Sequence, residues 1–581
     1  MSKKLISREI KGANMRSFTI ICLVVVFGAG CGSPEPDSTG ALPELVLPAK
    51  WDQAAQSIVA DKILADVTRL ASDGFEGRLP GSPGDGLARE YLAQRLAEMG
   101  YEPAFGEDGW QQPVEIVGLT SRMPDEWTFK SADGSEVSYR FAEEYMGASG
   151  RQEPEVSFED AEVVFVGYGI EAPEEQWDDF KGADLHGKVL LMLNDDPDWD
   201  EGLFAGERKL SYGRWTYKYE SAARQGAAAA IIIHTTPSAG YGWQVVRSSW
   251  MGEQFELAAG DEPRTGLNAW LTEDAARRLV ALSGHDLDKL VQAARSREFR
   301  PVPLGVTTSL DFAVDVRTTE TANVGGILRG SDPELADEVV IFSAHHDHFG
   351  IGEPDSTGDT IYNGALDNGV AMAQALAVAG AFTRLAKPPR RSVMFLFPAA
   401  EEQGILGSAF FAQSGVIDPG LIVADINFEL GNVWGKTRDV IVYGLGKNEL
   451  DDWLAAAARS QDRVVTGEKD VRAGWFYRSD QISFARIGVP AIWFKSGIDF
   501  IGRPPGWGEA RYAEWIDQHY HQPSDEVDSS WVLDGAVEDA TLAFMLGAAV
   551  ATAEETPGWY PGDEFEAERL QALAAVARTR P

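Results

Sequence analysis

The stretch EVVIFSAHHD, residues 338–347, sets the fold class, because an unbroken apolar strand runs directly into histidine and aspartate. Helical patterns at 370–385 and 449–458 alternate with further apolar runs of the same kind. These runs are NVGGILRG (323–330), SVMFLFPAAEE (392–402), LIVADINFEL (421–430), DVIVYG (439–444) and PAIWFK (490–495). Continuous apolar strands separated by helices are typical of a sheet buried on both faces. The sequence therefore predicts an α/β fold, with a β-sheet sandwiched by helices.

Residues 161–235 show a different pattern of predicted strands and helices. AEVVFVGYGI (161–170), GKVLLMLN (187–194) and AAAIIIHT (228–235) are typical of buried strands, and a helical pattern covers 217–227. This order predicts a small β-rich module inserted into a larger domain. Nearer the N-terminus, a Gly/Pro-rich loop at 72–84 leads into an amphipathic helix at 88–99.

Composition excludes several classes of protein. The 581 residues carry 51 Lys+Arg against 90 Asp+Glu, a formal charge of −39, which argues against nucleic acid as a partner. Aromatic residues make up 10% of the chain, so most of it has enough apolar surface to fold and is not disordered. With only two cysteines, it is no disulfide-stabilised scaffold.

The N-terminus predicts export. A ten-residue apolar run at 18–27 follows several basic residues, and ten helical residues rise only about 15 Å, too short to span a bilayer. Small residues then precede Cys31, as in bacterial lipoprotein signals, and 32–48 is typical of a Pro/Ser spacer. We therefore expect a cell-envelope protein tethered to the membrane by a lipid on Cys31. The alternative is an ordinary secretory signal that releases the chain.

Polar side chains gather where the predicted strands end. His345 and Asp347 follow one strand, Glu401 and Glu402 another, and Glu429 a third; ALDNG at 365–369 presents an aspartate before a helix. Ligand sites in open α/β sheets lie at the carboxyl ends of strands, so these groups converge. Many carboxylates cannot stay ionised together without cations. Imidazole and carboxylate ligands favour a pair of zinc ions, with manganese or cobalt as substitutes.

Six motifs in order carry a resemblance to a known family. They are HHD (345–347), ALDNG (365–369), AAEEQGILGS (399–408), NFELG (427–431), RSDQISFARIGVPA (478–491) and YHQPSD (520–525). This set resembles the co-catalytic zinc aminopeptidases of metallopeptidase family M28, which also contains glutamate carboxypeptidases, glutaminyl cyclases and the transferrin receptor. The resemblance implies a mixed sheet between helices, and the insert resembles a protease-associated (PA) domain.

The resemblance also implies roles for individual residues. The implied metal ligands are His345, Asp367, Glu402, Glu429 and His521. Asp367 would bridge the two zinc ions, His345 and Glu429 would hold one, and His521 and Glu402 the other. Most relatives have aspartate in place of Glu429.

Two further acidic residues would serve catalysis without binding metal. Asp347 would orient the His345 ring, and Glu401 would be the general base and acid. The resemblance also implies a cis peptide bond after Asp367. Other polar residues near these motifs are expected to have structural roles: His346, His348, His519, Tyr477 and Gln481.

These observations predict the following organisation: a signal peptide (1–30), a tether (31–50), the first part of the catalytic domain (51–118), the inserted PA domain with flanking segments (119–310), the catalytic peptidase domain (311–560) and a C-terminal helical tail (561–581). The function expected is an exported di-zinc aminopeptidase acting on peptides. Two alternatives remain: a glutaminyl cyclase or carboxypeptidase on the same scaffold, and a non-catalytic surface protein that binds partners through its PA domain.

Overall fold

The computed structural model describes residues 42–106, 109–200 and 202–579. The predicted signal peptide and Cys31 lie outside the described residues, so export and lipid attachment stay predictions.

One sheet organises the region that carries the six motifs. Its strands are β2 (Gln111–Ser121), β13 (Val302–Leu328), β17 (Ser392–Phe397), β14 (Val339–Ser343), β18 (Ile422–Asn427), β21 (Ala491–Ser496), β19 (Asp439–Tyr443) and β20 (Val464–Gly467), given in their order across the sheet. The central strands β17, β14, β18 and β21 are parallel, and the pairings of β13 with β17 and of β19 with β21 are antiparallel. The prediction of a mixed sheet is therefore confirmed.

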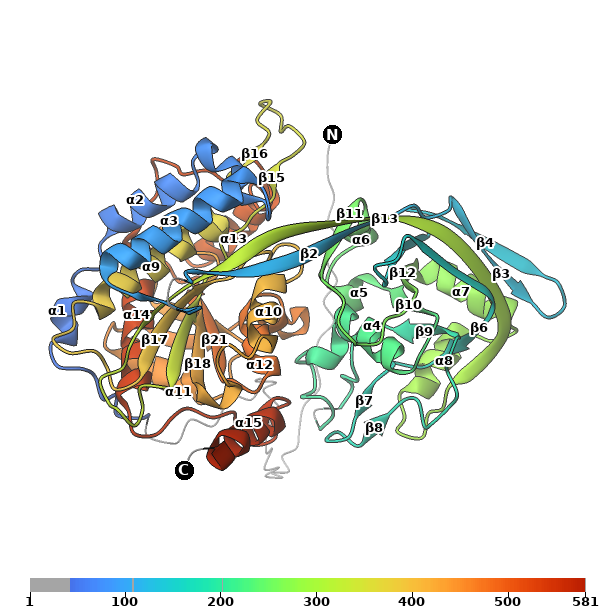
Figure 1. The fold of residues 1–581 in the computed structure, drawn as a ribbon. Helices are drawn as coiled ribbons and strands as arrows, with labels where there is room; N and C mark the ends of the chain where they lie inside the picture. The colour runs from blue at the N-terminus through green and yellow to red at the C-terminus, as the bar shows by residue number, and fades with distance from the viewer. Residues whose placement is uncertain (1–41, 107–108, 201, 580–581) are drawn as a thin grey trace, which may run out of the picture. The chain divides into compact units, whose positions relative to one another are not determined.

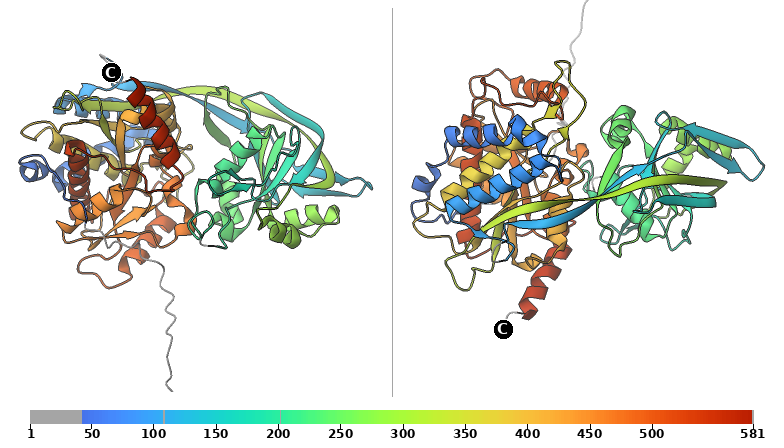
Figure 2. Two further views of the ribbon diagram at one scale, coloured as in Figure 1. Left: turned by 90° about the horizontal axis from the view of Figure 1, so that it is seen from below. Right: turned by 45° about the horizontal axis from the view of Figure 1, so that its top comes forward.

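Helices cover this sheet on both faces because alternate residues of each strand point in opposite directions. Val340 and Phe342 of β14 pack into one apolar core, and Ile341 packs into another. The first core is built with α1 (Trp51–Ala55), α2 (Ala60–Leu70), α3 (Pro83–Met99), α9 (Ala371–Phe382), α11 (Leu450–Arg459) and α14 (Asp534–Thr552). The second is built with α10 (Leu406–Gln413) and α12 (Gln481–Arg486). Figure 2 shows α2 and α3 beside α9.

A second sheet occupies the region where the sequence predicts an inserted module. Its strands, in spatial order, are β4 (Glu136–Arg140), β3 (Glu126–Ser131), β13, β6 (Glu155–Phe165), β9 (Val189–Leu193), β10 (Ala229–His234), β12 (Leu267–Thr272) and β5 (Tyr145–Ser149). It carries α4 (Trp215–Arg224), α5 (Thr236–Ala239), α6 (Trp243–Trp250), α7 (Glu273–Leu282) and α8 (Leu287–Ala294). The 27-residue strand β13 belongs to both sheets, as Figure 1 shows.

Three further elements matter for the site. A 3-10 segment η1 (Asp73–Arg78) connects α2 with α3, and α13 (Trp507–Gln518) precedes the YHQPSD motif. The C-terminal helix is α15 (Glu566–Thr579).

Two helical segments in the described part of the chain are long and apolar enough to cross a membrane. They are Ala365–Phe382 and Asp534–Thr552, and 94% and 78% of them is buried inside the protein. Such burial is typical of core helices, consistent with their packing in the first core.

Candidate active site

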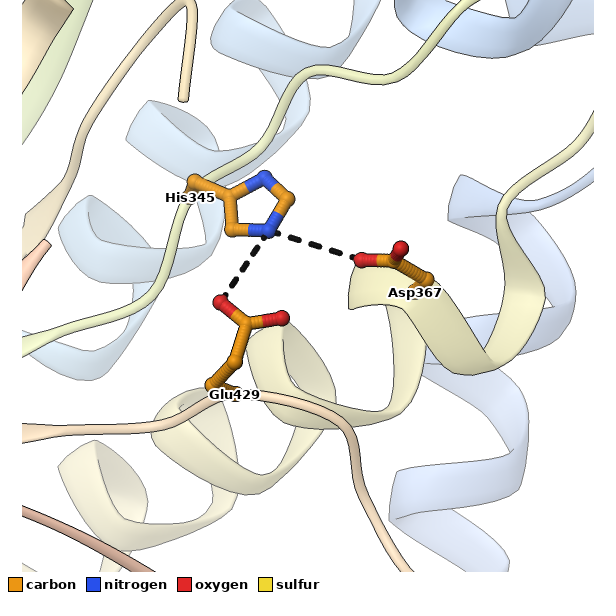
Figure 3. Close-up of side chains that lie close together, drawn as sticks. All are labelled: His345, Asp367 and Glu429. Carbon is orange, nitrogen blue, oxygen red and sulfur yellow. Dashed lines mark ion pairs between the residues drawn. The ribbon is translucent and has the colours of Figure 1, made fainter. Parts of the chain in front are cut away.

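His345 lies just beyond the carboxyl end of β14, where its ring is 1% exposed. Its Nε2 atom is 3.3 Å from a carboxylate oxygen of Glu429 and 3.6 Å from Oδ1 of Asp367, as Figure 3 shows. Glu429 follows β18, the parallel neighbour of β14, and Asp367 lies in the turn before α9. The predicted convergence of strand ends therefore brings these three side chains together.

A second group of donors shares Asp367. Nε2 of His521 is 3.3 Å from Oδ2 of Asp367 and 3.2 Å from Oε2 of Glu402. Each oxygen of Asp367 thus faces a different histidine, one in each group. This is the arrangement expected for a carboxylate that bridges two cations.

The donor spacing fits zinc. Two donors that each lie about 2.0 to 2.1 Å from a tetrahedral zinc are about 3.3 Å apart, longer than a usual N–H···O hydrogen bond. The four contacts above lie between 3.2 and 3.6 Å. Both nitrogens of His345 and Nε2 of His521 are buried without a hydrogen-bond partner among the described residues. These groups could therefore hold a pair of cations.

The carboxylates around His345 and His521 create a negative potential that favours positive charge at the site. Burial opposes protonation of His521, but Glu402 and Asp367 outweigh it and raise its pKa to about 10. Burial likewise opposes protonation of His345, yet Glu429 and Glu401 raise its pKa well above the usual value. In the metal-free protein the carboxylates therefore recruit protons to the imidazoles, a role that metal ions fill when they bind.

Glu401 is close to both groups but belongs to neither. Its Oε2 is 3.9 Å from Nε2 of His345, and its carboxylate accepts no hydrogen bond from any described residue. Burial and the neighbouring Glu429 and Glu402 raise its pKa well above the ordinary value, although His345 acts in the opposite direction. A carboxylate with a raised pKa beside a metal site is suited to accept and return a proton.

Asp347 has a different partner from the one the sequence predicts. Its Oδ1 is 3.6 Å from Nδ1 of His345, too long for a hydrogen bond. Instead its carboxylate accepts the backbone N–H groups of Glu401, at 3.0 Å, and Glu402, at 3.2 Å. Asp347 therefore fixes the backbone of the two glutamates directly and stands beside the His345 ring without a bond to it.

His348, expected to be structural, lies in the site. Its Nδ1 is 2.7 Å from Oε1 of Glu402, and the ring is fully buried. His348, Asp367 and Glu402 together could hold a metal ion. The short distance is that of a hydrogen bond, so in this structure His348 orients the Glu402 carboxylate while His521 faces its other oxygen.

The remaining polar residues that we expected to be structural point elsewhere. His346 contacts Asp85 at 3.0 Å, and the Gln481 amide is used by Asn427 and a backbone carbonyl. His519 contacts Ser524. The Tyr477 hydroxyl donates to Glu564.

Two residues that no sequence pattern pointed to hold the segment around Asp367 in place. Arg78 at the end of η1 is fully buried and donates to four backbone carbonyls, including that of Gly364. The Asp525 carboxylate accepts the backbone N–H groups of Leu366 and Asp367, at 3.0 to 3.1 Å. Asp525 stands in the quoted YHQPSD motif and Arg78 in the quoted Gly/Pro loop, but neither segment is a strand end, so nothing marked them as site residues. The peptide bond between Asp367 and Asn368 is cis, as the resemblance implies.

Comparison with known proteins gives a family match for the region that carries the six motifs. Residues 323–545 match the model of peptidase family M28. No curated protein matched the chain.

Matching solved structures include three bacterial proteins. The aminopeptidase from Aneurinibacillus sp. strain AM-1 is 20% identical, with a TM-score of 0.46 over 86% of this chain and 95% of that one. The peptidase M28 precursor from Shewanella amazonensis SB2B is 17% identical, with a TM-score of 0.41 over 88% and 97%. The zinc aminopeptidase BSAP from Bacillus subtilis is 17% identical, with a TM-score of 0.37 over 86% and 95%.

Proposed function

We propose that the chain is an exported di-zinc aminopeptidase that removes N-terminal residues from peptides. One observation carries this proposal: two groups of imidazole and carboxylate donors share Asp367 at metal-ligand spacing, with Glu401 beside them, 3.9 Å from His345. Manganese or cobalt could replace zinc, because the donors are nitrogen and oxygen only.

Each residue of the site has a separate role in the proposed hydrolysis. Zinc bound there supplies a Lewis acid that polarises a carbonyl group and lowers the pKa of water. Glu401 takes a proton from the attacking water and returns it to the departing amine. Asp347 keeps Glu401 in reach by holding its backbone N–H. Ser479 donates to Oε2 of Glu429 at 2.8 Å, which fixes the longer glutamate arm that stands where most relatives have aspartate.

Neighbouring glutamates provide a matched test. Glu401→Gln should retain two metal ions per chain while kcat falls by about 10² to 10⁴, the range for loss of a general base. Glu402→Gln should instead lower the metal content measured by elemental analysis. Retained turnover in Glu401→Gln would remove Glu401 from the mechanism, and fewer than two metals in the parent protein would argue for the cyclase alternative.

We further propose that residues 119–310 contain a PA domain and that Cys31 carries a lipid. The parallel strands β6, β9, β10 and β12 of the second sheet support the first proposal. Mass spectrometry of the mature N-terminus tests the second, since an unmodified Cys31, or an N-terminus elsewhere, would favour a secretory signal.

A further inference from the structure

Lys495 lies beside the candidate metal site, at the end of β21. This strand pairs in parallel with β18, with Trp493 opposite Asn427. Glu429 follows two residues after Asn427, and its charge acts on Lys495. Trp493 also donates from Nε1 to the Glu429 carbonyl at 3.2 Å, and Lys495 shares its face of the strand because side chains alternate.

The Lys495 side chain is enclosed by aromatic rings. Its Nζ is 4.6 Å from the ring centre of Tyr512, on α13, and 5.5 Å from that of Tyr443. The Tyr443 ring stacks on Trp493 at 3.9 Å, and Trp434 meets Tyr512 edge to face at 4.8 Å. We call these five residues the Lys495 cluster. Two of its polar groups, the Lys495 ammonium and the Tyr512 phenol, can both donate hydrogen bonds.

Neither of these two groups makes a hydrogen bond or ion pair with a described residue. Lys495 is 6% exposed, and its ammonium group makes no hydrogen bond or ion pair with any described residue. The Tyr512 hydroxyl is also buried without a hydrogen-bond partner in this part of the chain. Burial lowers the pKa of Lys495 to about 8, opposed by Glu429 and Asp539. Asp539 itself is already paired with Arg463 at 2.8 Å.

Other buried lysines of the protein are satisfied by comparison. Lys447 forms ion pairs with Asp563 and Glu564, at 2.9 and 2.8 Å. Lys218 donates to two backbone carbonyls, and Lys209 pairs with Asp195 at 3.1 Å. Burying an ammonium without a hydrogen bond or ion pair costs several kcal/mol, and a carboxylate bound beside Lys495 would supply the missing partner.

We propose that the Lys495 cluster binds the carboxylate of an acidic N-terminal residue, so that the enzyme prefers peptides beginning with glutamate or aspartate. The inference rests on the proposed aminopeptidase function. In such a reaction the side chain next to the scissile carbonyl lies close to the metal ligands, where Lys495 stands beside Glu429. Lys495 would supply the cation and Tyr512 a second donor, while the aromatic walls exclude water and strengthen the ion pair.

Anilides of single amino acids test this assignment, because glutamyl and glutaminyl anilides differ only in the charge of the side chain. The parent enzyme should show a kcat/KM at least about tenfold higher for the glutamyl anilide, since a polar site rejects an unmatched substrate strongly. Lys495→Met should lower kcat/KM for the glutamyl anilide by about 30-fold or more and change the glutaminyl and leucyl values by less than about threefold. Tyr512→Phe should lower the glutamyl value by about three- to tenfold.

Lys469→Met is the matched control, because Lys469 pairs with Glu509 of α13 at the surface and lies outside the cluster. It should leave all three values within about twofold. Equal losses on every substrate in Lys495→Met, or a parent enzyme that prefers the glutaminyl anilide, would overturn the inference.

A free C-terminal carboxylate of a short peptide is the other source of the same chemistry. Alanyl-leucine and its amide distinguish the two sources. If Lys495→Met lowered kcat/KM for the free acid and left kcat/KM for the amide unchanged, Lys495 would bind the C-terminal carboxylate. The proposed preference for an acidic first residue would then be wrong.

Failure of the proposed function gives a different result. If no aminoacyl anilide is hydrolysed, the aminopeptidase proposal fails, while calorimetry with free glutamate and free glutamine still tests the cluster. Glutamate should then bind the parent protein more tightly than glutamine, and Lys495→Met should abolish the difference. Equal binding of both ligands to the parent would overturn the assignment of Lys495.

Discussion

Replacing Arg78 should destabilise the fold and the metal site together. The guanidinium donates to the carbonyls of His346 (2.8 Å), Leu70 (2.9 Å), Asn363 (2.6 Å) and Gly364 (3.0 Å). Three of these carbonyls, those of His346, Asn363 and Gly364, lie in the segments that carry the ligands after β14 and before α9. Arg78 therefore links the α2–η1 region to both ligand segments through a single planar group.

The magnitude follows from those four bonds. Hydrogen bonds from a charged donor contribute about 1.5 to 3 kcal/mol each, but burying the guanidinium offsets much of that sum. Arg78→Met removes the side-chain donor from the carbonyls of His346, Leu70 and Asn363, whereas the Gly364 carbonyl still accepts the N–H of Gly369 at 3.2 Å. We expect a loss of about 3 to 5 kcal/mol of unfolding free energy. Arg78→Lys keeps the charge but has only three donors and no fork, so about 2 kcal/mol is expected.

Denaturant unfolding of the metal-free protein measures the first effect, and competition with a chelating dye measures the second. Metal affinity should fall by about 10- to 100-fold in Arg78→Met, as for other residues that orient ligands. Arg122→Met is the control, because Arg122 pairs with Asp315 at the surface and should cost less than about 1 kcal/mol. An unfolding free energy of Arg78→Met within about 1 kcal/mol of the parent value, together with unchanged metal affinity, would contradict this role of Arg78. Arg78 would then contribute by packing alone.

Other expectations concern the C-terminal segment, pH and metal removal. Glu564 accepts hydrogen bonds from Lys447 and Ser211, and its side chain is 4% exposed. Glu564→Gln should therefore cost about 2 to 4 kcal/mol in thermal unfolding, against almost nothing for the exposed Glu568→Gln. Burial raises the pKa of Asp451 to about 7, with Arg208 opposing and Asp452 reinforcing the shift. The folded state therefore holds the proton more tightly than the unfolded chain, and about 2 to 3 kcal/mol of stability should be lost as pH rises from 5 to 8, a loss that Asp451→Asn should remove in denaturation curves. Dialysis against a chelator should abolish peptide hydrolysis and lower Tm, with zinc restoring both; unchanged Tm would mean that the donors hold no ion that contributes to stability.

The ends of the strands could be predicted from the sequence because two separate patterns coincide there. An apolar run marks a buried strand, and a polar residue directly after it marks the sheet edge where ligands bind. This reasoning places His345, Glu402 and Glu429 with no knowledge of a family. His521 follows helix α13, so periodicity does not link it to the sheet edge, and only the resemblance supplied it.

Long-range contacts set the limit of that reasoning. The sequence predicts only 323–330 of β13, although the preceding residues alternate between buried and exposed positions from Leu304 to Val314. Alternation of this kind indicates a strand with one solvated face, whereas the continuous apolar runs used as the criterion detect strands buried on both faces. The first part of β13 is therefore not predicted, because only continuous apolar runs count as strands by this criterion.

Side-chain pairing is harder to foresee. Contacts between segments far apart in sequence decide whether Arg78, His348 and Lys495 are buried. A lysine at the end of the strand PAIWFK could equally well point into solvent or lie buried without an ion pair. The same three residues surround the predicted ligands and decide their orientation and surroundings. The sequence therefore predicts which groups bind metal better than it predicts what governs their affinity and specificity.

Hydrogen bonds to the backbone around Asp367 hold the donor groups at metal-ligand spacing. Asp525 fixes the N–H of Asp367, Arg78 fixes the carbonyl of Gly364, and Asp347 fixes the segment of Glu402. Each contact links a ligand segment to a buried group that binds no metal itself. Repulsion among the carboxylates would otherwise spread the segments apart, because separation relieves it. The buried hydrogen bonds oppose that relaxation, so the repulsion is retained until cations bind, and it becomes part of the affinity for them.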